Sequence, residues 1–476
     1  MKSFWHNFVL LLLIDFAKSD NNCDGLVDSW QDSKENLTIC NAEFTQMENE
    51  NAALLSIMEL ENGKFCYLKN KNIFKNIFFQ KFTVQCTEMS DWTDCSVLCG
   101  TGTQTRSIDC TLSGPEGIQK VSISESEECT SECHSTKLMV LGGSHDPRKY
   151  RDNPADIQAD VIDFSQSVPS LQCLKVSDIP EANLRNAVGG VIEDTPIICS
   201  GHIENTDTYE KTGLPTCLTL NNNGTWAFSV PLNKPRSFAS AVTINESLWI
   251  TGGSSIEDAK ILTDTELVTL KKSQNFVHLP EPMSSHCLIK INETHVLATG
   301  GENLNRSTEE VTVNTLSSTF LFDFNTHEWS SGPTLLQPRS GHACGSFDFG
   351  DSTLLVVAGG KEFNNTAKDN LALQSVEVLD TKEWSKGWQP AQNLPIELYY
   401  GSIVPLPNNK GLIFVGGEQS WRTGWLNINL LEFKCYGKSL DSCLWTANPS
   451  RNLAEASHGH VALWIPERIQ TTMFEC

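Results

Sequence analysis

Six short apolar runs recur along the chain from residue 135 onward, and each run ends on a glycine pair or on a single glycine. Their spacing of roughly 50 to 60 residues is typical of a repeat array whose units are small β-sheets. Each run is bounded by Gly, Asn, Pro or Ser, so each predicts a short strand in a mainly β fold. The six runs occupy residues 138–143, 196–201, 248–253, 295–301, 354–360 and 412–417.

The N-terminal part has a different pattern. Residues 42–60 carry apolar side chains at helical spacing, among them Phe44, Met47 and Leu54, which predicts one amphipathic helix. Residues 73–84 are rich in Phe and predict a strand or hairpin. Cysteines should staple these elements into a small Cys-rich module over residues 20–87, for which we expect an interaction or folding role rather than chemistry.

The first residues predict a secretory signal. Lys2 precedes the apolar stretch 8–14, and Ala17 and Ser19 are small residues at the positions that a signal peptidase reads. We therefore assign residues 1–19 to a signal peptide and expect a secreted, extracellular protein. No later segment is long and apolar enough to predict a membrane span. The formal net charge of −23 argues against nucleic acid and anionic membrane as partners.

Cysteine usage and glycosylation sequons agree with secretion. The chain contains 17 Cys, which fits an oxidising compartment better than the cytosol. Six Asn-x-Ser/Thr sequons are present, and five of them fall where the repeat predicts turns. The acceptors are Asn36, Asn223, Asn245, Asn292, Asn305 and Asn364.

Residues 88–134 carry a motif of closely spaced cysteines. Its members are Trp92, Cys95, Cys99, Gly100, Arg106, Cys110, Cys129 and Cys133. The motif resembles a thrombospondin type 1 repeat. This resemblance implies a long, thin unit of three strands that has almost no core and is held by disulfides. It also implies that Trp92 stacks on Arg106, a cation–π contact worth about 0.5–2 kcal/mol.

The resemblance further implies disulfide partners. Cys110 should pair with Cys86, while Cys95 and Cys99 should reach Cys129 and Cys133. In the repeat array we expect Cys435 to pair with Cys443. At least one remaining cysteine is free or bonded to another chain, and Cys476 is our first candidate. Partners stay open for Cys23, Cys40, Cys66, Cys173, Cys199, Cys217, Cys287, Cys344 and Cys476.

Departures from the thrombospondin pattern narrow what this segment can do. Leu98 replaces the usual O-fucose acceptor, whereas Trp92 remains a candidate for C-mannosylation. Residues 90–133 hold two basic side chains, Arg106 and Lys120, against eight carboxylates. Such an acidic strip repels sulfated glycans, so we do not expect heparin binding.

Two segments of the repeat array carry a second motif. Residues 322–329 (FDFNTHEW) are followed by 338–342 (PRSGH), and residues 376–384 read VEVLDTKEW; Trp226 and Trp445 fall in the same region of their repeats. These segments resemble kelch repeats, which implies a six-bladed β-propeller over residues 135–476. The first glycine pair has no strand before it, so we expect the apolar segment 456–464 to complete the first blade and hide two open sheet edges.

Kelch-like blades also raise an enzymatic alternative, a secreted copper-radical oxidoreductase similar to galactose oxidase. Such enzymes need two Tyr, two His and a Cys–Tyr crosslink around the metal. The available tyrosines are Tyr150, Tyr209, Tyr399, Tyr400 and Tyr436, and His458 and His460 lie where we expect packing. No spacing matches the metal set, and hydrolase and zincin motifs are missing. We therefore expect no catalytic residue, no metal and no cofactor.

A basic and aromatic patch is the candidate partner-binding site. The first and sixth repeats contribute loops with Arg148, Lys149, Tyr150, Arg151, Trp421 and Arg422. Trp, Tyr and Arg dominate interface energetics, so we expect a protein or other cell-surface partner here. The alternative is a solvated loop that only aids solubility. Arg185, Arg236 and Arg339 are further candidates, with hydrogen bonding between blades as their alternative role. The sequence thus predicts a secreted recognition or adhesion protein that binds a protein or glycan partner through the propeller loops and the thrombospondin repeat.

Overall fold

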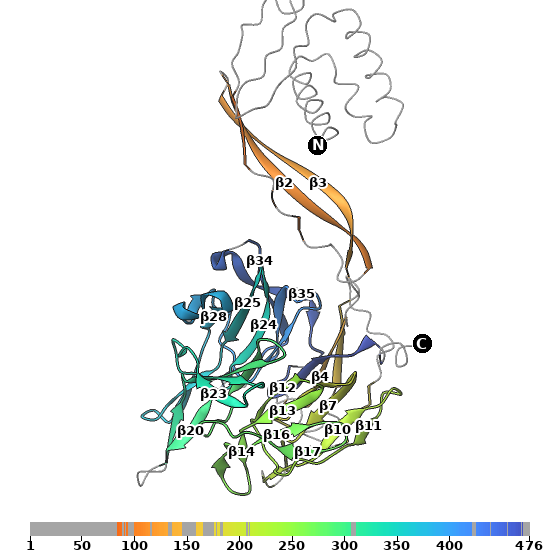
Figure 1. Cartoon of the computed structure of the whole chain (residues 1–476), viewed down its shortest axis with the longest axis vertical. Helices are drawn as coiled ribbons and strands as arrows, with labels where there is room; N and C mark the ends of the chain where they lie inside the picture. Colours follow the sequence, from red (N-terminus) through yellow and green to blue (C-terminus); the bar gives the residue numbers. More distant parts are fainter. Residues whose placement is uncertain are drawn as a thin grey trace, which may run out of the picture. The chain divides into compact units, whose positions relative to one another are not determined.

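The computed structural model describes residues 83–87, 90, 92–93, 100–114, 117–131, 136–144, 159–164, 176–177, 179–180, 184–205, 208, 210–305, 311–420, 425–437, 439–454, 456–467 and 469. These fall into two compact units, Met1–Asp94 with Gln104–Glu127 and Cys95–Thr103 with Glu128–Cys476. Nearly all of their described secondary-structure elements are strands (Figure 1). The predicted signal peptide, the helix over 42–60 and Asn36 lie outside the described residues.

The first unit contains β1 (Thr83–Cys86) and most of β2 (Gly100–Gly114) and β3 (Gly117–Ser131), which form an antiparallel sheet. Cys86 is paired in register with Cys110, and the two form a disulfide, the pair expected from the sequence. Cys129 is also in a disulfide. Cys95 and Cys99, which were expected to reach Cys129 and Cys133, lie outside the described residues, as does Cys133.

Beyond β1, side-chain hydroxyls take over part of the hydrogen bonding to β2. Three residues at a spacing of three each donate a backbone N–H to a β2 carbonyl, and their hydroxyls accept from β2 N–H groups. Each of the three β2 partners therefore has both its backbone N–H and its C=O hydrogen-bonded, although the neighbouring segment is not a regular strand. The pairs are Thr87 with Asp109, Ser90 with Ser107 and Thr93 with Thr105.

A layered contact involving Trp92 and Arg106 lies on this sheet, as predicted. The guanidinium carbon of Arg106 is 4.4 Å from the centroid of the Trp92 ring. The same guanidinium donates from Nε and Nη2 to Oε2 of Glu125, at 3.1 and 2.9 Å. Trp92 and Glu125 thus hold Arg106 from two sides, and the layer links the segment before β2 with β3.

The described residues of the second unit form six antiparallel sheets of three or four strands, besides five two-stranded hairpins. One sheet has three described strands, β36 (Val461–Trp464), β4 (Lys137–Leu141) and β5 (Ala159–Asp163). The other five have four strands each. In chain order, they are β6 (Val188–Ile192), β7 (Thr195–Cys199), β10 (Cys217–Leu220) and β11 (Trp226–Phe228); β12 (Ser240–Ile244), β13 (Ser247–Thr251), β16 (Thr265–Val268) and β17 (Ser273–Asn275); β18 (Cys287–Lys290), β19 (His295–Thr299), β22 (Thr319–Asp323) and β23 (Glu328–Ser331); β24 (Ala343–Phe349), β25 (Ser352–Ala358), β28 (Val376–Asp380) and β29 (Gln389–Ala391); and β30 (Ser402–Pro405), β31 (Gly411–Val415), β34 (Asn429–Cys435) and β35 (Cys443–Asn452).

The first strand of each sheet contacts the first strands of two neighbouring sheets. In order, β36 contacts β6, β6 contacts β12, β12 contacts β18, β18 contacts β24, and β24 contacts β30. β30 in turn contacts β36, which completes the cycle. β36, from the end of the chain, pairs with β4 from Val461 opposite Leu141 to Trp464 opposite Leu138. The sheet that contains the first glycine run therefore includes a strand from residues 456–464.

Apolar clusters fill the spaces between neighbouring sheets. The second strands are buried on both faces, which explains their nearly continuous hydrophobic sequence: five consecutive residues of β25, from Leu354 to Ala358, are buried. Trp226 and Trp445 lie in fourth strands and are buried, as expected. Trp384 differs, because it is half-buried in a short 3-10 helix, η1 (Thr381–Lys386), while Trp388 fills the core and donates from Nε1 to Pro333 O.

Three disulfides join pairs of described residues in the second unit. Cys435–Cys443 was expected, and it closes the hairpin between β34 and β35. Cys199–Cys217 joins two strands of one sheet. Cys287–Cys344 joins β18 to β24, the first strands of neighbouring sheets. In the parts of the chain that are described, no helix is long and apolar enough to cross a membrane.

Candidate functional site

The glycine runs end where neighbouring sheets meet. In all six repeats, the backbone N–H of the last glycine donates to a carbonyl just before the first strand of the next sheet. In five repeats (the second has Ser200) the preceding residue is also a glycine, and a side chain there would collide with that carbonyl: a Cβ on Gly359 would lie 2.2 Å from Leu398 O, and one on Gly252 would lie 2.3 Å from Met283 O. Both glycines have positive φ. The six bonds are Gly143 to Leu184, Gly201 to Arg236, Gly253 to Met283, Gly301 to Arg339, Gly360 to Leu398 and Gly417 to Ser457.

A second set of six hydrogen bonds lies two residues further along each repeat. One residue in each repeat, two positions before the first strand, has a φ between 51° and 64°. Its N–H donates to the carbonyl of the equivalent residue in the neighbouring repeat, at 2.7–3.3 Å. These bonds form a complete cycle, which we call the axial ring. In donor order, the ring runs Asn186, Gly459, Tyr400, Gly341, Ser285, Phe238 and back to Asn186.

Two members of the axial ring are large aromatic residues. Phe and Tyr rarely adopt a positive φ, and each costs about 1–3 kcal/mol of backbone strain. Phe238 and Tyr400 are three positions apart in the ring of six, on opposite sides, and their ring centroids are 5.5 Å apart. His202 packs on Phe238 and His458 on Tyr400. Aromatic side chains therefore fill the centre of the axial ring.

A charged group lies directly beside this aromatic cluster. Lys361, the first residue of β26 (Lys361–Asn364), is buried, and its Nζ is 5.0 Å from the centroid of Tyr400. Burial lowers the pKa of the Lys361 ammonium, but Tyr400, Glu302 and Glu418 outweigh that effect, so the pKa is raised. For the Glu418 carboxyl, burial has the opposite effect and raises the pKa. Lys361 is therefore a permanent cation, and nearby carboxylates balance its charge.

Among the described residues, five hairpins follow the glycine runs, on the same side of the sheets as the axial ring. In each, the first residue forms a bridge with the loop that enters a first strand, for example Ser340 with Lys361. The hairpins are β8 (His202–Glu204) with β9 (Lys211–Gly213), β14 (Ser254–Ser255) with β15 (Lys260–Ile261), β20 (Glu302–Asn305) with β21 (Thr312–Thr315), β26 with β27 (Asp369–Ala372), and β32 (Glu418–Ser420) with β33 (Trp425–Leu426). The axial ring and these hairpins form the candidate binding face.

Arg236 and Arg339 do not reach the candidate binding face. Both side chains are fully buried and pair with Glu266 and Glu377, respectively, at 2.7 and 2.6 Å. Their Nη1 atoms also donate to carbonyls of their own repeats, Gly252 O and Gly359 O. We therefore remove both residues from the partner-binding set. The alternative role, hydrogen bonding between blades, is filled by their backbone carbonyls rather than by the guanidinium groups.

Arg185 differs from these two arginines by one position in the repeat. The carbonyl that receives the glycine N–H belongs to Arg236 and Arg339 in their repeats, but to Leu184 in the repeat of Arg185. Arg185 instead bridges to His202, and its half-exposed side chain pairs with Glu204 at 2.5 Å. Leu184 points into the core, so Arg185 faces the candidate binding face and stays a candidate contact.

Six residues of the predicted basic and aromatic patch lie outside the described residues. They are Arg148, Lys149, Tyr150, Arg151, Trp421 and Arg422. Their described neighbours lie close together. Ser144 bridges to His458, and Nδ1 of His458 is 3.5 Å from Oε2 of Glu418 in β32. β32 ends at Ser420, directly before the second segment. Ser144 and Glu418, which precede the two segments in the chain, therefore both lie beside His458.

Several sequons lie in turns that fix the acceptor amide. Oδ1 of Asn292 accepts from the backbone N–H and the hydroxyl of Thr294, and Asn223 makes the same bonds with Thr225. Asn245 lies in the two-residue turn between β12 and β13. Asn305 and Asn364 end β20 and β26, on the hairpin side.

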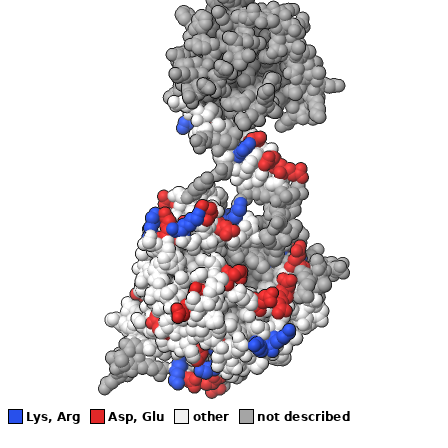
Figure 2. Space-filling model, viewed as in Figure 1, with Lys and Arg blue, Asp and Glu red and all other residues white. Residues whose placement is uncertain are grey.

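Charged side chains of both signs lie on the surface of the described residues. Figure 2 shows acidic side chains scattered over the described part of the face in view, with basic ones between them. Among the described residues, no group of three or more His, Cys, Asp or Glu side chains could hold a metal ion. The hydroxyl of Tyr400 is hydrogen-bonded with Lys361 and Ser285, and burial raises its pKa.

The chain is similar to a domain family, to a curated protein and to solved structures. Residues 88–138 match the family model of the thrombospondin type 1 domain, which confirms the resemblance seen in the sequence. Beta-scruin of Limulus polyphemus is 39% identical over 69 residues, which are 14% of this chain and 8% of that protein. The chain thus matches less than a tenth of that relative's length. The solved structure of YjhT aligns with a TM-score of 0.49 and 14% identity, over 61% of this chain and 90% of that one.

Proposed function

We propose that the chain is a secreted, non-enzymatic recognition protein. Residues 1–19 are its signal peptide, 20–87 its Cys-rich module, 88–134 its thrombospondin type 1 repeat and 135–476 a six-bladed kelch propeller. The axial ring carries the propeller assignment, because six equivalent residues donate in a complete cycle that includes Gly459. In this arrangement, the C-terminal strand closes the first blade, and the ring face is free to bind a partner.

An extracellular or cell-surface protein is the proposed partner. It docks on the loops of the first and sixth blades through Arg148, Lys149, Tyr150, Arg151, Trp421 and Arg422, with Arg185 at the edge. The nearness of Ser144, His458 and Glu418 supports a shared surface for both loops. Nucleic acid and heparin are poor partners for a chain with a net charge of −23. Cys476 is a proposed site for an interchain disulfide.

A binding role also fits the filled axis better than oxidase chemistry does. In the centre, Tyr400 is bonded to a buried ammonium and packed on Phe238, so its hydroxyl is already engaged. A copper-radical site would need tyrosine hydroxyls as ligands, and that of Tyr400 is occupied by its hydrogen bonds. We therefore do not carry the oxidoreductase alternative further.

The test is a loss-of-binding experiment. The secreted protein and a variant with Arg148→Ala, Arg151→Ala and Trp421→Ala are compared for binding to cells and extracellular matrix. A matched control carries Lys271→Ala and Lys272→Ala, which remove two exposed basic residues from the turn between β16 and β17, at the opposite end of the strands. We expect at least a tenfold loss for the first variant and none for the control. Equal binding by all three proteins would refute the proposed binding surface.

A further inference from the structure

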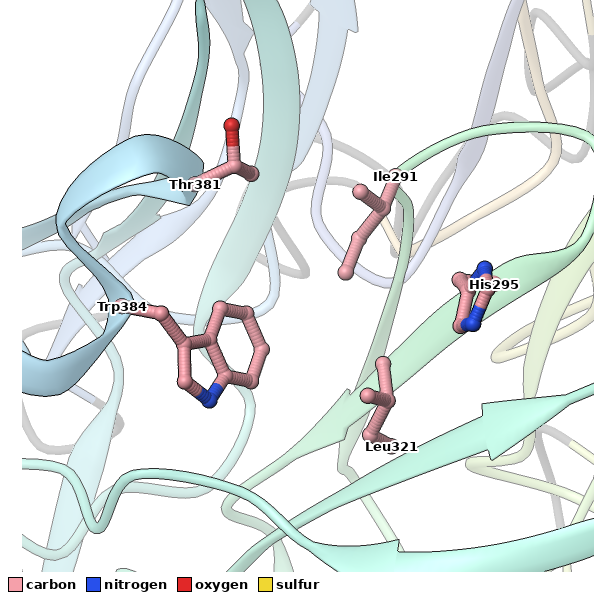
Figure 3. A pocket seen from close by; sticks show the side chains of 5 residues that line it. All are labelled: Ile291, His295, Leu321, Thr381 and Trp384. Atoms are coloured by element: carbon pink, nitrogen blue, oxygen red, sulfur yellow. The ribbon is translucent and has the colours of Figure 1, made fainter.

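An open pocket lies between the fourth and fifth sheets, at the strand ends opposite the axial ring. Its volume is about 320 Å³, and it is lined by Ile291, His295, Leu321, Thr381 and Trp384. Figure 3 shows the indole of Trp384 extending from η1 toward Ile291 and Leu321, with His295 on the far side. The pocket thus spans two repeats, and η1 supplies one wall.

The lining of this pocket is mainly apolar. Ile291, Leu321 and Trp384 are partly buried and pack on the core cluster around Leu297 and Leu355. Thr381 turns its hydroxyl to accept from the N–H of Thr353, so it offers little to a ligand. An aromatic face left partly open beside aliphatic side chains suits an occupant that has one apolar face and polar edges.

A glycan acceptor lies on the rim of the same pocket. Asn292 is in the turn between β18 and β19, directly after Ile291 and three residues before His295, both lining residues. Its Oδ1 accepts from Thr294 N and Oγ1 and from His295 N, at 2.8–2.9 Å. These bonds fix the amide, so Nδ2, the atom that carries a glycan, faces away from the turn.

We propose that the first N-acetylglucosamine of a glycan on Asn292 occupies this pocket and packs its apolar ring face on Trp384. This inference rests on the proposed secretion of the chain, because only a secreted chain acquires the glycan. Consecutive Cα atoms are 3.8 Å apart, so a sugar on Asn292 is within reach of the wall formed by Ile291. Many small dispersion contacts with the indole then hold the sugar, and the sugar covers apolar surface that is otherwise open.

A double-mutant cycle tests the contact. Trp384→Ala removes the stacking face, and Asn292→Asp removes the glycan while keeping an oxygen that accepts from Thr294 and His295. Protein secreted by glycosylating cells is made as wild type, each single variant and the double variant, and thermal unfolding is measured for all four. The matched control replaces Asn292→Asp by Asn223→Asp, because Asn223 has the same turn geometry and lies away from this pocket.

We expect Trp384→Ala to lower the Tm in the wild-type and Asn223→Asp backgrounds by about 2 °C more than in the Asn292→Asp background. Equal losses in all three backgrounds would overturn the inference. Mass spectrometry of the sequon peptides adds a second test. A glycan missing from Asn292 but present on other acceptors overturns this inference and leaves the proposed function standing, whereas no glycan on any acceptor overturns both.

Discussion

The two units stabilise their strands in opposite ways. In the first unit, hydroxyls of Thr87, Ser90 and Thr93 replace missing strand bonds, and among its described residues Cys110 is the only buried apolar side chain. In the second unit, six apolar clusters fill the gaps between sheets, and two sets of six bonds link each sheet to the next. The first unit is held by independent layers, the second by contacts that depend on a complete cycle.

This difference predicts how damage spreads. Removing one layer of the first unit should weaken that layer and little else. Removing one member of the cycle in the second unit should expose the edges of two sheets and weaken every repeat, because Ser457 and Gly142 meet although 315 residues separate them.

Removal of the closing strand should have the largest effect. Deleting residues 455–476 takes away β36, exposes the edge of β4 and breaks both hydrogen-bond cycles. We expect the truncated chain to be retained in the cell, or to lose cooperative unfolding of the second unit. The secreted level and the thermal transition are measured against full-length protein. A stable, well-secreted truncation would refute the closure.

Loss of a buried arginine should cost less but still be severe. Arg339→Ala leaves the buried Glu377 carboxylate without its cation, which should lower the free energy of unfolding by about 3–5 kcal/mol. Arg185→Ala is the matched comparison, because its pair with Glu204 is partly exposed and should contribute less than about 1 kcal/mol. Denaturant unfolding of both variants gives the two values. Similar losses would contradict the assigned difference in position.

Acid should weaken the second unit selectively. Burial lowers the pKa of His286 to about 3, and burial together with Lys211 and Arg185 lowers that of His202 to about 4. In the unfolded chain both histidines bind a proton near pH 6.5, so unfolding takes up protons below that pH. Their contribution to stability is present above about pH 6.5 and is lost as the pH falls toward 4. We expect the Tm of the second unit to fall steadily over this range.

The control for this pH profile separates buried from exposed histidine. His286→Asn should flatten the slope of Tm against pH, whereas His327→Asn, at an exposed position that already has positive φ, should leave it unchanged. The profile is measured by scanning calorimetry. An identical slope in wild type and His286→Asn contradicts the assignment.

The smallest effect is expected in the first unit. Arg106→Ala removes the contact with Trp92 and an exposed pair with Glu125, worth about 0.5–2 kcal/mol together. Limited proteolysis followed by mass spectrometry should show faster cleavage within residues 83–131 and unchanged cleavage within 210–305. Faster cleavage in both regions would mean that the layer is not independent.

The general architecture was readable from the sequence because its signals are local. Glycine runs mark backbone crowding, and the spacing around Trp92 and Cys110 marks a known module. The axial ring was not readable, because Gly occupies it in only two repeats, while Phe238 and Tyr400 contradict local preference there. Without the ring, the sequence does not show that Arg185 lies one position later in its repeat than Arg236 and Arg339 do in theirs. The sequence therefore assigns all three arginines the same role.

Two other features of the structure, the buried Trp388 and one disulfide, are missing from the sequence predictions for different reasons. Trp384 matches the motif, yet Trp388 fills the core, because η1 adds a turn that shifts the later residue inward. The Cys287–Cys344 pair did carry a signal. Its separation of 57 residues is close to the repeat spacing, which places both cysteines at equivalent positions of neighbouring sheets. Neighbouring first strands lie side by side, so that spacing could have indicated the disulfide.

Hydrogen exchange of the six ring amides tests the closed cycle most directly. If the C-terminal strand completes the ring, the N–H groups of Asn186 and Gly459 are as strongly protected as those of Ser285 and Gly341, because all four donate to ring carbonyls. Exchange of intact protein, read by NMR or by mass spectrometry of short peptides, should therefore give one common rate class. Rapid exchange at Asn186 and Gly459, with slow exchange at the others, would show an open array and contradict the proposed propeller.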